Sequence, residues 1–251
     1  MSSAALHSLL LLADSALPLG SFAFSSGLES FLAHNKQTQP TAAKRLQAFD
    51  VFFEQSIANI ASTALPYVLT AYGDAGQLDD LDNDFDASTP CTVSRRASVA
   101  QGRALLGIWE RALAASAADD NGSKRAAEVL TVFATAMKSS NAPDEYGLQR
   151  NGHFPPLFGL TCAAMGLSRK DTAYLFVLNH AKALLSAAVR ASVMGPFQSQ
   201  AMLASGKLQS CIRRCIEREQ SRLPSETAIV TPSMDLWMGR HELLYSRIFN
   251  S

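Results

Sequence analysis

The chain is poor in charged residues, in cysteine and in unbroken apolar stretches. Only 18% of its 251 residues are charged, and 22 basic residues balance 22 acidic ones. Proteins that bind nucleic acid usually carry a basic excess that neutralises phosphates, so this balance argues against that class. Four cysteines are far too few for a disulfide framework in a chain of this length. We therefore expect reduced thiols and a cytoplasmic protein.

No apolar segment has the length and uniformity of a membrane-spanning helix, which needs about 18 to 20 residues with few or no charges. The longest candidate, residues 183–197, contains Arg190 and has Pro196 near its end. The apolar run Leu9–Leu12 has no basic region before it and is soon interrupted by Asp14, so we do not interpret it as a signal peptide. We expect no membrane association.

The pattern of apolar residues predicts a fold made of α-helices. Alanine, leucine and serine dominate, and apolar residues recur at the three- and four-residue spacing of helices rather than in alternation. We expect an all-α, single-domain bundle of about ten helices that spans residues 1–251. Pro66 removes a backbone hydrogen-bond donor and predicts a kink or a division in the longest helix. The expected helices cover approximately residues 6–13, 25–33, 41–72, 92–118, 123–139, 157–165, 169–193, 198–204, 208–222 and 233–249.

The clearest interruption of the helical pattern is residues 74–90, which are rich in aspartate. An EF-hand loop that began at Asp80 would need Gly at its sixth position and Glu at its twelfth. The chain has Phe85 and Cys91 at those positions. We therefore interpret residues 74–90 as a solvated acidic loop.

No group of residues in the sequence corresponds to a familiar catalytic centre. We find no nucleophile elbow, no phosphate-binding loop and no glycine-rich dinucleotide turn. The five histidines are scattered, and none lies four residues from another histidine or from a cysteine. Cys211 and Cys215 would share a helix face and could supply half of a metal site, so a small helical metalloenzyme is the alternative hypothesis. The leading expectation is a protein that is not an enzyme and that binds no metal or cofactor tightly.

One arginine stands in a segment that is otherwise apolar nearly all round. Arg190 lies near the end of the predicted helix 169–193. A buried guanidinium that is left unpaired costs several kcal/mol. We expect Arg190 to form a buried structural ion pair. The alternative is that Arg190 lines a polar passage.

The segment Asp14–Glu29, which reads DSALPLGSFAFSSGLE, has the most informative local pattern. A proline and a glycine predict a tight bend, an aromatic residue flanks it, and a second glycine allows close backbone approach where the next helix begins. Two interpretations remain open: a packed helix–turn–helix corner, or an exposed aromatic surface for a partner. The residues that we assign to this structural turn are Pro18, Gly20, Phe22, Gly27 and Glu29.

Five segments together resemble the UreF-type urease accessory proteins. Each alone is weakly specific, but five in the expected order along almost the whole chain are a strong signal. They read DSALPLGSFAFSSGLES (14–30), SRRASVAQGRALL (94–106), HFPPLFGLTCAAMGLS (153–168), LLSAAVR (184–190) and PSMDLWMGRHELLYSRIFNS (232–251).

The resemblance implies an all-helical fold, a homodimer and no catalysis by this chain. It implies assembly with a UreD/UreH-like accessory protein and a UreG-like GTPase, and docking of that assembly on apo-urease. The assembled complex, rather than this chain by itself, would handle the nickel that is delivered to urease.

Two surfaces are candidates for partner contacts. The tail, residues 233–251, combines aromatic and basic side chains of the kinds enriched at interfaces. By resemblance it would insert into the UreD/UreH-like partner, with Arg247 and Phe249 foremost; the alternative is a helix packed on its own bundle. A partly basic stripe on residues 95–103 would contact the GTPase or the dimer mate, or be a solvated face. The candidates are Trp237, Arg240, His241, Tyr245, Arg247 and Phe249 in the tail, and Arg96, Gln101 and Arg103 in the stripe.

Overall fold

The structure, a computed structural model, describes residues 2–139, 144 and 147–250. Within these residues the chain forms eleven α-helices and no β-strand, which confirms the expected all-α bundle. The helices are α1 (Ser3–Ala13), α2 (Leu28–His34), α3 (Ala42–Gly73), α4 (Leu78–Ser88), α5 (Thr92–Ile108), α6 (Asn121–Lys138), α7 (Phe154–Ala164), α8 (Arg169–Arg190), α9 (Pro196–Leu203), α10 (Gly206–Glu219) and α11 (Ser233–Arg240).

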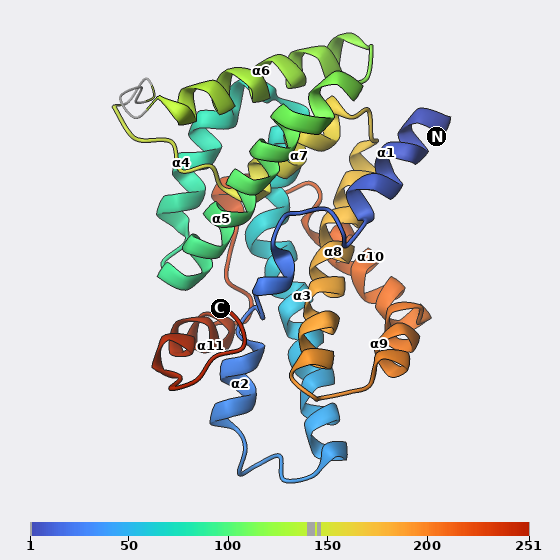
Figure 1. The fold of residues 1–251 in the computed structure, drawn as a ribbon, viewed down its shortest axis with the longest axis vertical. Helices are drawn as coiled ribbons and strands as arrows, with labels where there is room; N and C mark the ends of the chain where they lie inside the picture. Colours follow the sequence, from blue (N-terminus) through green and yellow to red (C-terminus); the bar gives the residue numbers. More distant parts are fainter. Residues whose placement is uncertain (1, 140–143, 145–146, 251) are drawn as a thin grey trace.

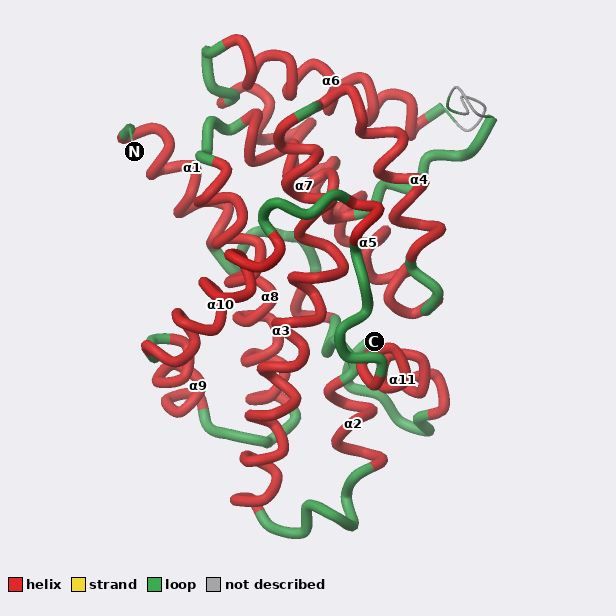
Figure 2. Tube along the Cα trace, turned by 180° about the vertical axis from the view of Figure 1, so that it is seen from behind, coloured by secondary structure: helices red, strands yellow, loops and turns green. Residues whose placement is uncertain are grey.

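Two long helices, α3 and α8, form the centre of the bundle (Figure 1). Helix α7 packs between α3 and the outer helices α5 and α6, and α6 lies across one end of the molecule. Helices α9 and α10 pack against the other side of α8 and α3, as the view from behind shows (Figure 2). The short helices α2 and α11 lie together near the opposite end. The two ends of the sequence therefore come together at α2 and α11.

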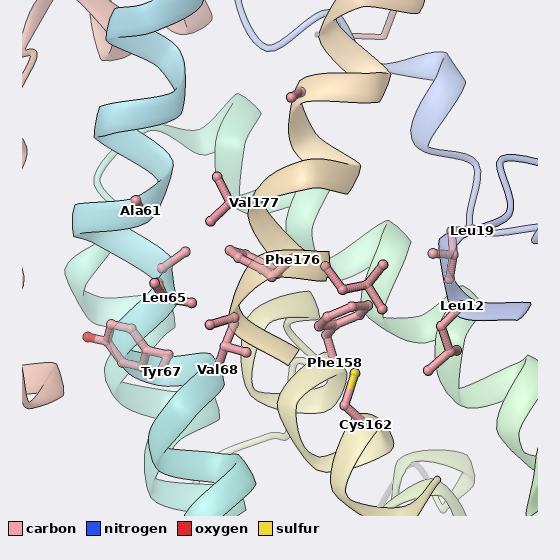
Figure 3. Close-up of a cluster of buried hydrophobic side chains, with 14 of the residues drawn as sticks. Leu12, Leu19, Ala61, Leu65, Tyr67, Val68, Phe158, Cys162, Phe176 and Val177 are labelled. Atoms are coloured by element: carbon pink, nitrogen blue, oxygen red, sulfur yellow. The ribbon is translucent and has the colours of Figure 1, made fainter. Parts of the chain in front are cut away.

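Buried apolar side chains from four segments form one continuous core (Figure 3). Phe158 of α7 and Phe176 of α8 pack with their ring centroids 5.6 Å apart. Val68 of α3 lies beside them, and Leu12 of α1 reaches the same cluster. Each such side chain contributes about 1.5–3 kcal/mol when it is fully buried. This core holds the segment that follows α1 against α3, α7 and α8.

Helix boundaries depart from the expectation at two internal places. Pro66 is buried inside α3, which continues past it as one helix, so the proline does not divide the helix. The segment expected as one helix over residues 92–118 is α5 only as far as Ile108. It then continues as a π-helical turn, Trp109–Leu113, and a 3₁₀ turn, Ala114–Ser116.

The interpretation of residues 74–90 as a solvated loop is wrong, because most of this segment is helix α4. Leu78, Leu81 and Phe85 are buried and follow the three- and four-residue spacing of one helix face. Aspartates occupy most of the remaining positions, and those in the first turn interact favourably with the positive end of the helix dipole. The high aspartate content concealed a narrow apolar stripe.

Helix α8 is long and apolar enough to cross a membrane by length and composition. In this fold 56% of its most apolar window is buried inside the protein. Ser168 caps its start, as the sequence suggested, by accepting the backbone N–H of Asp171 at 3.1 Å. Helix α8 is thus the core helix of the bundle.

Glycine is required where α7 crosses α3. A Cβ atom added at Gly159 would lie 1.9 Å from the carbonyl oxygen of Val68. We predict that Gly159→Ala lowers the free energy of unfolding by about 3 kcal/mol or more, since the helices must move apart. Gly107→Ala in α5 is the matched control, because nothing lies within 4 Å of its added Cβ. Its effect should stay within about 1 kcal/mol. Urea denaturation measures both values, and equal effects would contradict the prediction.

Candidate partner-binding surface

Helix α11 packs directly onto the beginning of α2. Gly27 precedes α2 with a φ of 82°, and a Cβ added there would lie 3.1 Å from the Cβ of Trp237. The Trp237 ring meets Phe31 edge to face, with centroids 5.5 Å apart. The segment 18–34 and residues 233–250 therefore form one unit, which we call the C-terminal corner. Gly27 and Glu29 of the segment Asp14–Glu29 are packed in this corner, whereas Phe22 is 66% exposed, so the segment has both a packed side and an exposed aromatic side chain.

Glu29 holds the tail in place. Its carboxylate accepts the backbone N–H groups of Ile248 at 2.6 Å and Phe249 at 3.1 Å. The same carboxylate lies 2.9 Å from Nε2 of His241, which is 0% exposed. Because a carboxylate only accepts, Nε2 carries the hydrogen of this bond. Three donors from one end of the chain thus converge on one side chain from the other end.

Arg190 completes the attachment of the tail. Its guanidinium lies over the ring of Phe249, 4.3 Å from the centroid, and donates to the carbonyl of Phe22. Next to it, the backbone N–H of Asn250 donates to the carbonyl of Ala23 at 2.7 Å. The expectation of a buried ion pair at Arg190 is wrong. The residue is exposed in the last turn of α8, where a carbonyl and an aromatic face replace the expected carboxylate.

The tail does not form the single helix expected over residues 233–249. Helix α11 ends at Arg240 and is followed by a 3₁₀ turn, His241–Leu243. Beyond this turn, Glu29 and Ala23 accept the backbone N–H groups of residues 248–250. As a consequence His241 and Phe249 point inward, with 0% and 3% exposure. Both were candidates for partner contact, and in this conformation they pack inside the chain instead.

Large apolar side chains of the tail face outward. Leu236, Leu243, Tyr245 and Ile248 are 64%, 73%, 106% and 65% exposed. We call these four residues the tail patch. The sequence pattern pointed to Tyr245, but Leu236 and Leu243 were missed because they read as core positions of a helix. Leu243 lies beyond the early end of α11, which no local signal indicated, whereas Leu236 lies on α11 itself.

The two candidate surfaces meet at a charged bridge. Arg96 of α5 and Arg247 of the tail both pair with the carboxylate of Glu242. Arg96 holds the pKa of Glu242 below its usual range. Arg240 lies over the ring of Trp237 at 5.9 Å. Charged groups therefore border the apolar tail patch.

The predicted stripe on α5 is divided between different neighbours. Arg96 faces the tail, and Gln101 accepts the hydroxyl of Ser21 at 3.1 Å. Arg103 donates to the carbonyl of Asn151 at 3.0 Å. Of the three, Arg96 and Arg103 remain exposed.

A second buried carboxylate organises the segment before α7. Asp82 of α4 is 1% exposed and accepts the backbone N–H groups of Asn151, Gly152 and His153 at 2.7, 3.0 and 2.6 Å. These charge-assisted bonds are among the stronger hydrogen bonds in proteins. Asp82 therefore connects the acidic helix to the start of α7.

His153 joins α4, α5 and α7 through both ring nitrogens. Nε2 lies 3.1 Å from Asp86, and Nδ1 lies 3.1 Å from the hydroxyl of Ser98. Since Asp86 only accepts, Nε2 carries hydrogen and Nδ1 accepts the hydroxyl of Ser98. The oxygen of Ser98 also accepts the N–H of Phe154 at 3.2 Å.

Serine, histidine and aspartate in this order are the residue types of serine nucleophiles, and sequence spacing gave no sign of the cluster. The His153 side chain is 0% exposed, so it cannot pass a proton to a leaving group that enters from outside. The Ser98 oxygen is in addition committed to the first turn of α7. We interpret this cluster as a structural connection between three helices.

A cavity of about 560 Å³ lies between the 12–26 segment, α3, α5 and α8. His180 of α8 lines it and contacts the hydroxyl of Ser56 at 2.9 Å. Burial lowers the pKa of His180 to about 4. Lys182, also in the lining, donates to the carbonyl of Ala13.

The alternative metal site finds little support. Cys211 and Cys215 are both buried on α10 and share a face, as expected. Among the residues that the structure describes, no group of three or more His, Cys, Asp and Glu side chains could hold a metal ion. The cysteine pair therefore has no third protein ligand within that part of the chain.

We predict that Asp82→Ala lowers the free energy of unfolding by about 3–5 kcal/mol, because three buried N–H groups lose their acceptor. Asp80→Ala is the matched control on the same helix: Asp80 is exposed and its removal should change stability by about 0.5 kcal/mol or less. Chemical denaturation measures the difference. Hydrogen exchange at residues 151–153 should quicken only in Asp82→Ala, and unchanged exchange there would argue against the connection.

We also predict that His180 makes stability depend on pH. Its pKa is about 4 when folded, against an ordinary 6.5, so the unfolded chain binds a proton more readily between these values. The contribution of neutral His180 to the free energy of unfolding is fully present above pH 6.5. It decreases by about 3 kcal/mol as the pH falls toward 4. His180→Gln should show a correspondingly flatter profile, whereas His7→Gln, at an exposed position, should follow the parent chain. Parallel profiles for His180→Gln and the parent would contradict this.

Comparison with known proteins is consistent with the segments identified in the sequence. The sequence model of the UreF family matches residues 44–206. An uncharacterized UreF-like urease accessory protein of Schizosaccharomyces pombe is 36% identical and covers 98% of this chain and 97% of its own length. Urease accessory protein F of Oryza sativa subsp. indica is 30% identical over 95% of this chain and 82% of its own. Urease accessory protein UreF of Haemophilus influenzae is 25% identical and covers 98% of this chain and 95% of its own length. The chain belongs to the UreF family of urease accessory proteins.

Proposed function

We propose that this chain is a non-catalytic scaffold that assembles with a UreD/UreH-like accessory protein and a UreG-like GTPase. The assembly docks on apo-urease and delivers nickel, which is cargo of the complex. In the same proposal the chain is a cytoplasmic homodimer. The observation that carries the proposal is the tail patch, four exposed apolar side chains at a corner that contacts within the chain hold together.

The tail patch has the composition of an interface core with a polar border. Aromatic and aliphatic side chains lie at its centre, and Arg96, Arg240, Arg247 and Glu242 surround or adjoin it. Since the corner is already ordered by Glu29 and Arg190, a partner that binds it does not have to order the tail first. We assign this surface to the UreD/UreH-like partner.

The inward residues take a different role in this proposal from the one that the sequence suggested. His241 and Phe249 position the backbone that presents the tail patch, and Trp237 anchors α11 on α2. Tyr245, with Leu236, Leu243 and Ile248, makes the direct contact. Arg247 orders the tail through its hydrogen bonds to Glu242 and lies at the border of the tail patch.

The exposed part of α5 is assigned to the GTPase or to the dimer mate. Arg96 and Arg103 remain exposed there, although each already has one partner inside the chain. Exposed ion pairs exchange partners at little cost, because each contributes about 1 kcal/mol or less.

We predict that the tail patch can be disabled without unfolding the chain. Leu243→Asp combined with Tyr245→Ala should weaken capture of the UreD/UreH-like partner about 30-fold or more, as expected for the loss of an interface hot spot. Val132→Asp on α6 is the control, because Val132 is 68% exposed and lies far from the tail in sequence. Quantitative co-purification gives the comparison, and circular dichroism verifies that both variants keep their helices. Full capture by the double variant would refute the assignment.

The role in nickel delivery is tested by complementation. Cells that lack their own UreF-like factor would receive the parent chain, the double variant or the Val132→Asp control, and urease activity and urease nickel content would be measured together. The parent and the control should restore both, and the double variant neither. If the parent chain leaves urease without nickel, the proposed function is wrong.

A further inference from the structure

The pair Cys211 and Cys215 is chemically distinct from the other thiols of the chain. The two lie one turn apart at the edge of the buried stripe of α10 and are 8% and 6% exposed. Cys162 is fully buried in the core, and burial raises the pKa of its thiol. Cys91 lies on a different element, directly before α5. Only on α10 do two of these four cysteines share a helix face.

The two thiols of the pair share one proton unequally. A hydrogen bond from Cys215 lowers the pKa of Cys211 to about 7, and the same contact together with burial raises the pKa of Cys215. Arg214 and Arg218 on α10 also favour a thiolate at these positions. Glu54 on α3 opposes it, but Glu54 is paired with Lys207 at 2.7 Å. The contact therefore favours the thiolate at Cys211 and the thiol at Cys215.

We propose that Cys211 and Cys215 form a modification site that hydroperoxides oxidise to an intrahelical disulfide. The Cys211 thiolate attacks the peroxide, the O–O bond breaks, and a sulfenic acid and one hydroxide (or alkoxide) form. The sulfur of Cys215 then displaces hydroxide from the sulfenic acid, and the proton of its thiol converts that hydroxide to water. In total two thiols lose two hydrogens and the peroxide is reduced.

The disulfide is incompatible with a regular α10. Cβ atoms one helical turn apart are about 5–6 Å from each other, whereas a disulfide needs about 3.5–4.5 Å. The helix must therefore distort between residues 211 and 215. Ile212, inside this turn, is fully buried, and α10 packs on α3 and α8. Oxidation is thus expected to loosen α10 from the core of the bundle, independently of the scaffold role proposed above.

The test treats the purified chain with hydrogen peroxide in slight excess near pH 7. Peptide mapping should find residues 211 and 215 joined with the loss of two hydrogens, while Cys91 and Cys162 stay reduced. Helical circular dichroism should decrease and should recover with dithiothreitol. The rate of oxidation should rise as the pH passes through about 7, where the Cys211 thiolate forms.

Two single variants separate the attacking thiol from the resolving thiol. In Cys215→Ser the sulfenic acid of Cys211 persists, so labelling by dimedone should be about tenfold or more above the parent chain, in which Cys215 consumes it. In Cys211→Ser neither disulfide nor label should form at residue 215. Equal dimedone labelling in the parent and Cys215→Ser, or oxidation of Cys91 in preference to the pair, would overturn the proposal.

Discussion

Glu29, whose side chain is 11% exposed, joins the two ends of this chain. Its carboxylate accepts two backbone N–H groups of the tail and contacts His241, so the tail is held against the corner. Arg190 adds a carbonyl contact and an aromatic face to the same junction. His241 and Phe249 are held inward at this junction, whereas residues 245–248 stay exposed. The surface that we assign to a partner therefore depends on contacts made beside it within the same chain.

The same device recurs at the other end of the bundle. Asp82 accepts three consecutive backbone N–H groups before α7, and His153 connects that segment to α4 and α5. In both places a carboxylate from one segment accepts backbone amides from a distant one, and at Glu29 the ring of His241 adds a third donor. This explains how a chain with only 18% charged residues can hold irregular segments rigidly. It also explains why so much of its surface remains uncharged and available for contact.

Sequence reasoning succeeded where the controlling interactions are local. The three- and four-residue spacing of apolar side chains located α3, α6, α8 and α10. Sequence reasoning failed where charge density concealed a buried stripe, as in α4, and where the helix of the tail ended early, at Arg240. At the candidate site Tyr245 is exposed, whereas His241 and Phe249 are buried; which of these residues contact a partner stays a prediction.

The amino-acid sequence by itself determined the helical class and the family resemblance, since these follow from periodicity and motif order along the chain. Only the tertiary structure decided which tail residues face outward, that Asp82 and Glu29 accept distant backbone amides, and that Arg190 needs no carboxylate. The physical reason is that backbone amides outside helices have no preferred partner in sequence. Their acceptors become known only when segments that lie many residues apart are brought together by the core.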